Sequence, residues 1–177
     1  SFAERQLLEM KDQNRQLEAR LVQLVRHGEQ NDLILSRCHQ LSLALMQADT
    51  LEQAVDAIVR TFDKQFGLQR VALRLWHDAA NPSPFYNATQ DIRLRAGNLC
   101  APYCGPYVND EILSWFPTQP VLQSFATIAL RQQGEAFGLL VLGSEDSQRF
   151  SQDMQTHYLA QMGELIAVAL QRVLAAA

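Results

Sequence analysis

The sequence lacks the patterns that mark a membrane-spanning or a secreted protein. No apolar run approaches the roughly 20 residues that a transmembrane helix needs, and no signal-peptide pattern opens the chain. Its three cysteines are an odd number in a chain of 177 residues, which does not fit a secreted disulfide framework. We therefore expect a cytoplasmic protein without a membrane partner.

Lysine and catalytic motifs are also scarce. Lysine occurs only at Lys11 and Lys64, and the net charge of −4 argues against a nucleic-acid surface, because phosphate binding needs a basic patch. The glycine-rich nucleotide motifs, the G-x-S-x-G hydrolase motif and the H-E-x-x-H metalloprotease motif are all missing. The length suits one sizeable domain plus an extension.

The cysteines and histidines do not form a metal-binding pattern. Cys100 and Cys104 are separated by three residues, but structural zinc needs four ligands and no second cysteine pair exists. The four histidines are scattered along the chain without close spacing. The sequence therefore predicts no metal site, and it names no cofactor.

Residues 2–26 contain no proline or glycine and predict a helix with a heptad repeat. Asn14 takes an a position, where asparagine fixes register and favours two strands. The a and d positions, which we call the α-helical seam, are Leu7, Met10, Asn14, Leu17, Leu21 and Leu24. This seam predicts a homodimer, parallel or antiparallel, and the alternative is a helix that lies back on its own domain.

Weaker signals follow the seam. Residues 28–32 predict either a bend or a continuing helix with weak a and d positions at Gly28 and Asn31. Thr50 and Gln53 have capping-box spacing for a second helix, which Gly67 is suited to end. We accordingly divide the chain into a coiled-coil extension over residues 1–47 and a globular domain over residues 48–177.

The globular part alternates strands and helices. Residues 69–77 predict a strand in which Leu73 and Leu75 share one face. Residues 124–131 and 136–144 predict a hairpin, and because both runs are apolar on both faces, the sheet should be covered on each side. Weaker patterns predict short strands over residues 86–94 and 120–122 and a helix over residues 106–116.

The C-terminal stretch begins with the apolar strand over residues 137–142 and ends in a long amphipathic helix. Ser151 is a suitable N-cap for this helix, Asp153 suits its positive end, and Met154 opens its apolar stripe. The order G-L-L-V-L-G-S, a spacer, R-F and a terminal helix resembles the end of a GAF domain. With its leading helix, the whole chain resembles the DUF484 family of GAF-like proteins.

This resemblance implies an α+β fold of the PAS/GAF type, with an antiparallel sheet of five or six strands flanked by helices. It also implies a ligand pocket between the sheet and residues 97–120. The candidate pocket residues are Leu73, Leu75, Tyr103, Cys104, Gly105, Tyr107, Glu111 and Trp115. The aromatic side chains either form the walls of this pocket or fill it completely.

Cys104 is the candidate for chemistry, because it precedes the predicted helix over residues 106–116. The amides at a helix N-terminus lower the pKa of a thiol and attract anions, whereas a packed apolar cysteine is the plainer interpretation.

Three functions are compatible with this sequence. The leading hypothesis is a non-catalytic sensory or regulatory module that dimerises, binds a small molecule and passes the change to a protein partner through its helices. The second is a structural adaptor whose pocket is filled by its own aromatic side chains. The third is a thiol-dependent enzyme similar to the GAF-like free-methionine-sulfoxide reductases.

Overall fold

The computed structural model describes residues 1–152 and 156–177 and forms two compact units, Ser1–Arg37 and Cys38–Ala177. Helix α1 (Phe2–Met46) contains the first unit except Ser1 and continues into the second, so the helix passes through Gly28 without a break. The helix predicted over residues 2–26 is confirmed. Because Leu41 and Leu45 are fully buried in the core of the second unit, that unit begins at Cys38, before our proposed boundary at residue 48.

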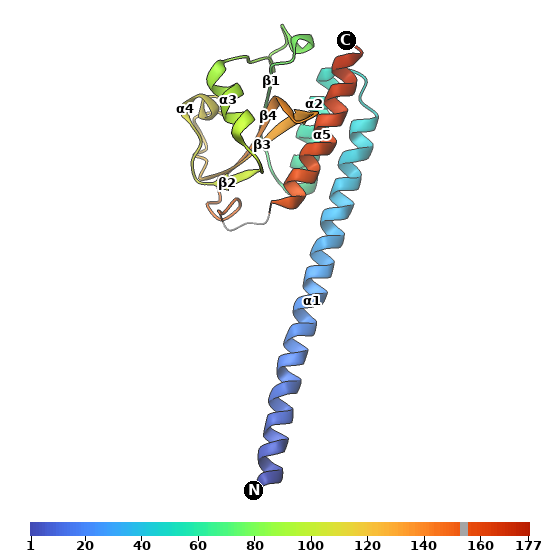
Figure 1. Ribbon diagram of the computed structural model, residues 1–177, viewed down its shortest axis with the longest axis vertical. Helices are drawn as coiled ribbons and strands as arrows, with labels where there is room; N and C mark the ends of the chain where they lie inside the picture. The colour runs from blue at the N-terminus through green and yellow to red at the C-terminus, as the bar shows by residue number, and fades with distance from the viewer. Residues whose placement is uncertain (153–155) are drawn as a thin grey trace. The chain divides into compact units, whose positions relative to one another are not determined.

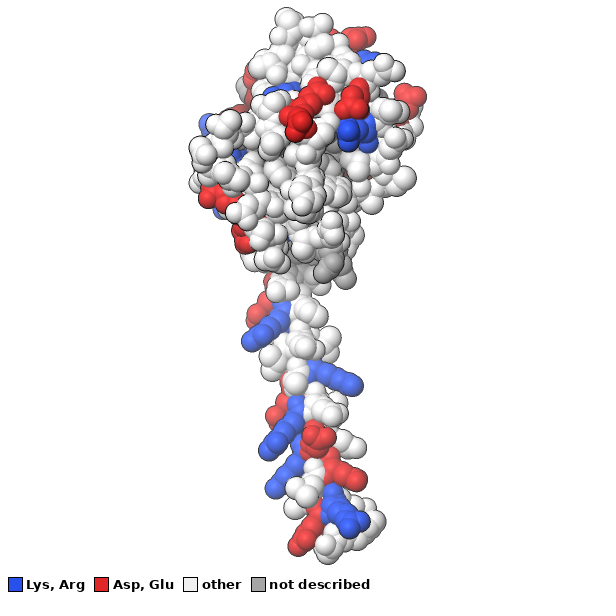
Figure 2. Space-filling view, turned by 90° about the vertical axis from the view of Figure 1, so that its left-hand side faces the viewer, with Lys and Arg blue, Asp and Glu red and all other residues white. Residues whose placement is uncertain are grey.

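The first unit is a helix with no core of its own. All of residues 1–33 are exposed, including the leucines of the α-helical seam, such as Leu17 at 60% and Leu24 at 68% exposure. Acidic and basic side chains are interspersed along this helix on the face in view, with no patch of one sign (Figure 2). Among the described residues, no helix combines the length and the hydropathy that a membrane span requires.

The second unit is built on an antiparallel sheet with the order β1-β4-β3-β2 (Figure 1). Its strands are β1 (Arg70–Leu75), β2 (Tyr103–Gly105), β3 (Ser124–Gln132) and β4 (Glu135–Ser144). The predicted hairpin is confirmed. Its turn places Gln133 at φ 51° and Gly134 at φ 85°, a backbone conformation that glycine adopts without strain.

The α+β fold class is confirmed, but the described part of the chain contains four strands rather than five or six. The strand predicted over residues 86–94 is wrong: Tyr86 forms a single bridge with Leu75, and helix α3 (Gln90–Asn98) follows. Ile92 and Ala96 are both fully buried one helical turn apart, which is the period of a helix. Residues 120–122 form no strand either.

Helices α2 (Leu51–Phe66), α5 (His157–Ala175) and the end of α1 cover one face of the sheet, which we call the helical face (Figure 1). Thr50 caps α2 by accepting a hydrogen bond from the amide of Gln53, and Gly67 ends it at φ 65°, as predicted. Gly163 lets α5 approach closely, since a β-carbon there would lie 2.6 Å from Cγ2 of Ile128.

Helix α5 begins later than predicted. It starts at His157, and Ser151 lies outside it, while Asp153 and Met154 lie outside the described residues. Thr156 occupies the N-cap position without a side-chain hydrogen bond. The Ser151 N-cap prediction is therefore wrong.

The opposite face, which we call the pocket face, is covered by shorter elements. They are α3 and α4 (Asp110–Leu113), which is much shorter than the predicted helix over residues 106–116. We call residues 87–116, apart from β2, the covering segment. The 3₁₀ turn η1 (Asp78–Ala80) packs instead on the helical face against α5, where Ala80 is buried. Both tryptophans belong to the layer on the pocket face: Trp76 is buried and donates from Nε1 to the carbonyl of Ala136 at 2.9 Å, and Trp115 packs at its edge. The sheet is thus covered on both sides, as predicted.

Candidate functional site

A pocket of about 530 Å³ opens on the pocket face of the sheet. Strands β2, β3 and β4 contribute Tyr103, Thr127 and Leu139, and the covering segment contributes the other side chains. Those side chains are Arg95, Asn98, Leu99, Tyr107, Val108, Asn109 and Ile112. An apolar lining with a few polar groups is the usual composition of a small-molecule site.

Hydrogen bonds between polar residues connect the two helices beside the pocket, α3 and α4. The carboxylate of Asp91 accepts hydrogen bonds from Nε of Arg95 at 2.9 Å and from Nδ2 of Asn109 at 3.1 Å. Oδ1 of Asn109 in turn accepts from the amide of Ile112 at 2.9 Å, which caps α4. Asn109 therefore joins α3 to α4, and Arg95 brings a guanidinium to the pocket lining.

Arg131 holds the wall of the pocket from the end of β3. Its Nη2 donates to the carbonyls of Ala96 at 3.0 Å, Gly97 at 3.1 Å and Leu99 at 2.7 Å, and its Nη1 donates to Gly134 at 2.8 Å. A cation at the C-terminal end of a helix also interacts favourably with the helix dipole. Arg131 thus fixes the end of α3 and the Leu99 backbone beside the pocket.

The same residue contacts the helical face. Nε2 of Gln171 in α5 donates to the backbone carbonyl of Arg131 at 3.0 Å. One residue of β3 therefore connects the pocket wall with the C-terminal helix. No pattern in the sequence predicts this role, because the acceptors are backbone carbonyls more than thirty residues upstream.

The structure brings only part of the predicted site together. Tyr103 and Tyr107 line the pocket, and Tyr107 is 78% exposed, so it does not fill the cavity. Gly105 lies beneath the Tyr103 side chain, where any β-carbon would collide with the phenol. Gly105 therefore allows Tyr103 to fold over β2 toward the pocket.

Three predicted pocket residues lie on the opposite side of the sheet. Leu73, Leu75 and Cys104 belong to the core beneath α2 and α5 on the helical face. The alternation along β1 was predicted correctly, but its two faces were assigned the wrong way round: Ala72 and Trp76 face the pocket layer. Periodicity separates the two faces of a strand without saying which of them faces a ligand.

Glu111 and Trp115 belong to the covering segment but do not line the pocket. Oε1 of Glu111 accepts from Nδ2 of Asn87 at 3.2 Å and from Oγ1 of Thr89 at 2.9 Å, so its carboxylate holds the loop before α3. The ring of Trp115 packs against Arg74, whose Cζ lies 5.0 Å from the ring centroid. Both residues support the covering layer.

The surroundings of Cys104 are the opposite of those that activate a thiol. Cys104 lies inside β2, paired with Ala126 of β3, and is 6% exposed. The expected helix N-terminus does not follow it, because α4 begins only at Asp110. Burial raises the pKa of the Cys104 thiol, which leaves less thiolate at neutral pH. Among the described residues, no group of three or more His, Cys, Asp or Glu side chains could hold a metal ion.

Native-state alkylation is expected to modify Cys100 first and Cys104 last at pH 7. Cys100 is exposed, Cys38 is half-buried and Cys104 is buried, and burial raises the pKa values of Cys38 and Cys104. Raising the pH should speed the modification of all three thiols, and unfolding should remove the differences. Peptide mass spectrometry after iodoacetamide treatment measures the order, and rapid modification of Cys104 at neutral pH would contradict this assignment.

Solved structures of GAF domains share this fold. The GAF domain of an Acinetobacter phosphoenolpyruvate-protein phosphotransferase is similar with a TM-score of 0.58 and 11% identity, over 81% of this chain and 95% of that one. The corresponding domain from Coxiella burnetii gives a TM-score of 0.58 and 16% identity over the same shares. A free methionine-R-sulfoxide reductase from Neisseria meningitidis, solved with its substrate, is similar with a TM-score of 0.58 and 12% identity, over 81% of this chain and 92% of that one.

At these identities the likeness establishes a GAF-like fold and leaves the ligand and the activity open. A comparison with curated proteins finds no match. A family model described as "Protein of unknown function, DUF484" matches residues 1–174, which is nearly the whole chain and includes α1. The chain belongs to the DUF484 family.

Proposed function

We propose that this protein is a non-catalytic regulatory module that binds a small molecule in the pocket on the pocket face and dimerises through the α-helical seam. The observation that carries the proposal is the open pocket of about 530 Å³, which the aromatic side chains leave unfilled. This volume lies within the range of small-molecule sites. The adaptor alternative required a pocket filled by its own side chains, and the buried Cys104 weighs against the thiol-dependent enzyme.

The lining indicates the class of ligand. Leu99, Val108 and Leu139 offer apolar surface, while Arg95, Asn98 and Asn109 bring side chains with hydrogen-bond donors to the lining. A small molecule with an apolar body and one carboxylate or carbonyl group matches this distribution. Binding of a ligand in the pocket would change the arrangement of the helices only if the ligand has different affinities for two arrangements of the chain. The contacts of Arg131 with α3 and α5 supply a physical route for such a difference.

Native mass spectrometry on protein taken directly from lysate is expected to show an added mass that the denatured protein lacks. Val108→Trp, which places an indole at the half-buried pocket wall, should abolish the added mass. Val121→Trp is the matched control, because Val121 is 61% exposed and does not line the pocket. Equal retention of the added mass in both variants would overturn the proposed site.

A further inference from the structure

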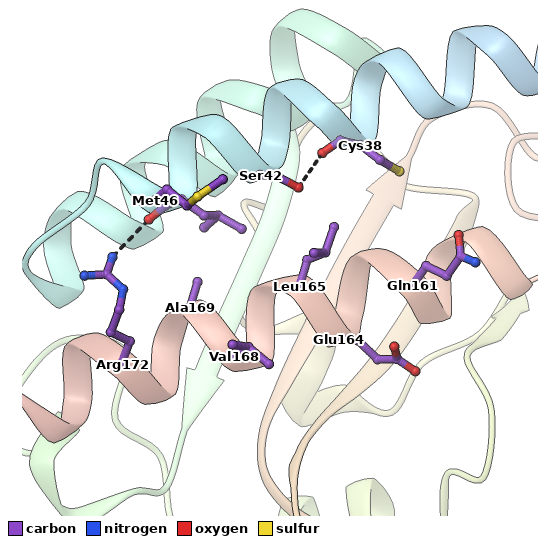
Figure 3. A pocket seen from close by; sticks show the side chains of 10 residues that line it. Cys38, Ser42, Met46, Gln161, Glu164, Leu165, Val168, Ala169 and Arg172 are labelled. Atoms are coloured by element: carbon purple, nitrogen blue, oxygen red, sulfur yellow. Dashed lines mark hydrogen bonds between the residues drawn. The ribbon is translucent and has the colours of Figure 1, made fainter.

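Two apolar hollows of the second unit differ in how their polar side chains are satisfied. The larger, of about 710 Å³, lies between the end of α1 and α5 (Figure 3). There Oγ of Ser42 donates to the carbonyl of Cys38 at 2.9 Å, and Arg172 donates to two main-chain carbonyls. The other polar side chains of its lining, Gln161 and Glu164, are exposed to solvent. Among the described residues, this hollow therefore has no buried side-chain nitrogen or oxygen without a partner.

The pocket on the pocket face, in contrast, has a buried hydroxyl without a partner at the sheet. Thr127 lies on the face of β3 that Phe125 and Ala129 share, and its neighbours across the sheet are Tyr103 and Val141. Thr127 is 6% exposed, and its hydroxyl forms no hydrogen bond with any residue that the structure describes. Side-chain oxygens sealed from solvent all have partners in that part of the chain, so this hydroxyl is open to the pocket. A ligand that hydrogen bonds to it satisfies a group that the fold leaves unpaired.

A second set of unused donors belongs to Arg95, near the opening of the pocket. Among the described lining residues Arg95 is the charged one, and 54% of its side chain is exposed. Its Nε donates to the carboxylate of Asp91 at 2.9 Å, whereas Nη1 and Nη2 form no hydrogen bond within the described part of the chain. The guanidinium is planar, so a partner at Nε leaves the edge formed by Nη1 and Nη2 available for a bidentate contact with a carboxylate.

The charge balance around Arg95 favours an anion with a single charge. The Asp91 carboxylate already lies 2.9 Å from Nε, and within the described residues no acidic side chain lines the pocket. A phosphate ester carries about −1.5 to −2 charges at neutral pH, which would leave negative charge uncompensated beside Asp91. A carboxylate carries one charge and matches the two parallel donors of the free guanidinium edge.

We propose that the pocket binds an elongated monocarboxylate that carries a second hydrogen-bonding group. The carboxylate pairs with the free edge of Arg95 near the opening, the apolar body lies against Leu99 and Leu139, and the second polar group meets the hydroxyl of Thr127 at the sheet. The inference rests on the proposed function of this pocket. It adds the chemical class of the ligand, its orientation and two specificity-determining residues.

The charge of the ligand is tested by saturation-transfer NMR titrations of the full chain at pH 7. The probes are butanoate, hexanoate and octanoate, each compared with its primary amide and with its ω-hydroxy acid. The best acid should bind at least about ten-fold more tightly than its amide, because the amide lacks the charge that pairs with the guanidinium. Arg95→Gln should remove this preference. Arg93→Gln, which removes a charge from the same helix at an exposed position outside the pocket, should keep it.

The role of Thr127 is tested with the same probes. The unchanged chain should bind the best ω-hydroxy acid about two- to ten-fold more tightly than the plain acid of the same length, and Thr127→Val should abolish this difference. Valine has nearly the same shape and removes an unpaired buried hydroxyl, so the midpoint of thermal unfolding without probe should stay the same or rise. A residue that only supported the fold would lower the midpoint and leave the difference between the two probes unchanged.

The outcomes separate this inference from the proposed function. Equal affinities for acids and amides, a preference that survives Arg95→Gln, or no gain from any ω-hydroxyl group overturns the inference. Absence of binding by every probe overturns it too, while an added mass in lysate protein that Val108→Trp abolishes would then leave the pocket itself in place. Probe binding that Val108→Trp does not reduce contradicts both the inference and the proposed pocket.

Discussion

Replacing Leu17 and Leu24 together by lysine is expected to convert the proposed dimer into monomers. Both residues take d positions of the α-helical seam and are 60% and 68% exposed in the single chain. Burying a leucine contributes about 1.5–3 kcal/mol, and a dimer loses four of them. The loss of at least about 6 kcal/mol corresponds to a dissociation constant raised roughly 10⁴-fold or more. Light scattering at micromolar concentration measures the change.

The matched control is Leu8→Lys with Val22→Lys. These residues are similarly exposed, at 66% and 52%, but they take b positions, outside the seam. The control pair should remain dimeric. If both pairs stay dimeric, the seam does not hold the dimer together. If both become monomeric, the heptad register is wrong, because charge anywhere on the helix would then be sufficient.

Replacing Arg131 by methionine is expected to lower the free energy of unfolding by about 2–3 kcal/mol, because hydrogen bonds to charged groups contribute about 1.5–3 kcal/mol each and these are partly exposed to solvent. For a domain of this size the midpoint of thermal unfolding should fall by about 5–10 °C. Methionine keeps much of the apolar stem while removing the donors to Ala96, Gly97 and Leu99. Calorimetry measures the shift.

Arg93→Met is the matched control, since Arg93 lies exposed on α3 and its loss should change the midpoint little. Arg131→Met should also weaken whatever molecule native mass spectrometry detects in the pocket, because the Leu99 backbone loses its support. A midpoint equal to that of the Arg93 control would show that the wall of the pocket does not depend on the guanidinium.

The sequence was informative where local rules decide the structure. The capping of α2 by Thr50, its end at Gly67 and the hairpin turn at Gln133–Gly134 depend on neighbouring residues, and each was predicted. The region over residues 86–94 failed because its weak alternation of apolar residues fits both a strand and a helix. There, packing of Ile92 and Ala96 against the pocket face of the sheet decides for the helix.

The site was harder to predict than the fold, because it depends on tertiary contacts. Tyr103 and Cys104 are adjacent in β2, yet one lines the pocket and the other is buried beneath α5. Successive side chains of a strand point to opposite faces of the sheet, and this alternation does not distinguish the two faces. Only the arrangement of the covering elements decides which of two adjacent residues faces the pocket. Arg131 illustrates the same limit, since no pattern in the sequence links it to carbonyls of helix α3, from which β2 and α4 separate it along the chain.

The position of the two tryptophans has a consequence for spectroscopy. Trp76 and Trp115 are the tryptophans of this chain, and both pack in the layer that covers the pocket face. Helices α1 and α5 contain none. Intrinsic tryptophan fluorescence is therefore a selective reporter. Its emission should change when the surroundings of the pocket change, whereas sliding or separation of the terminal helices should leave the emission unchanged unless the sheet itself is disturbed.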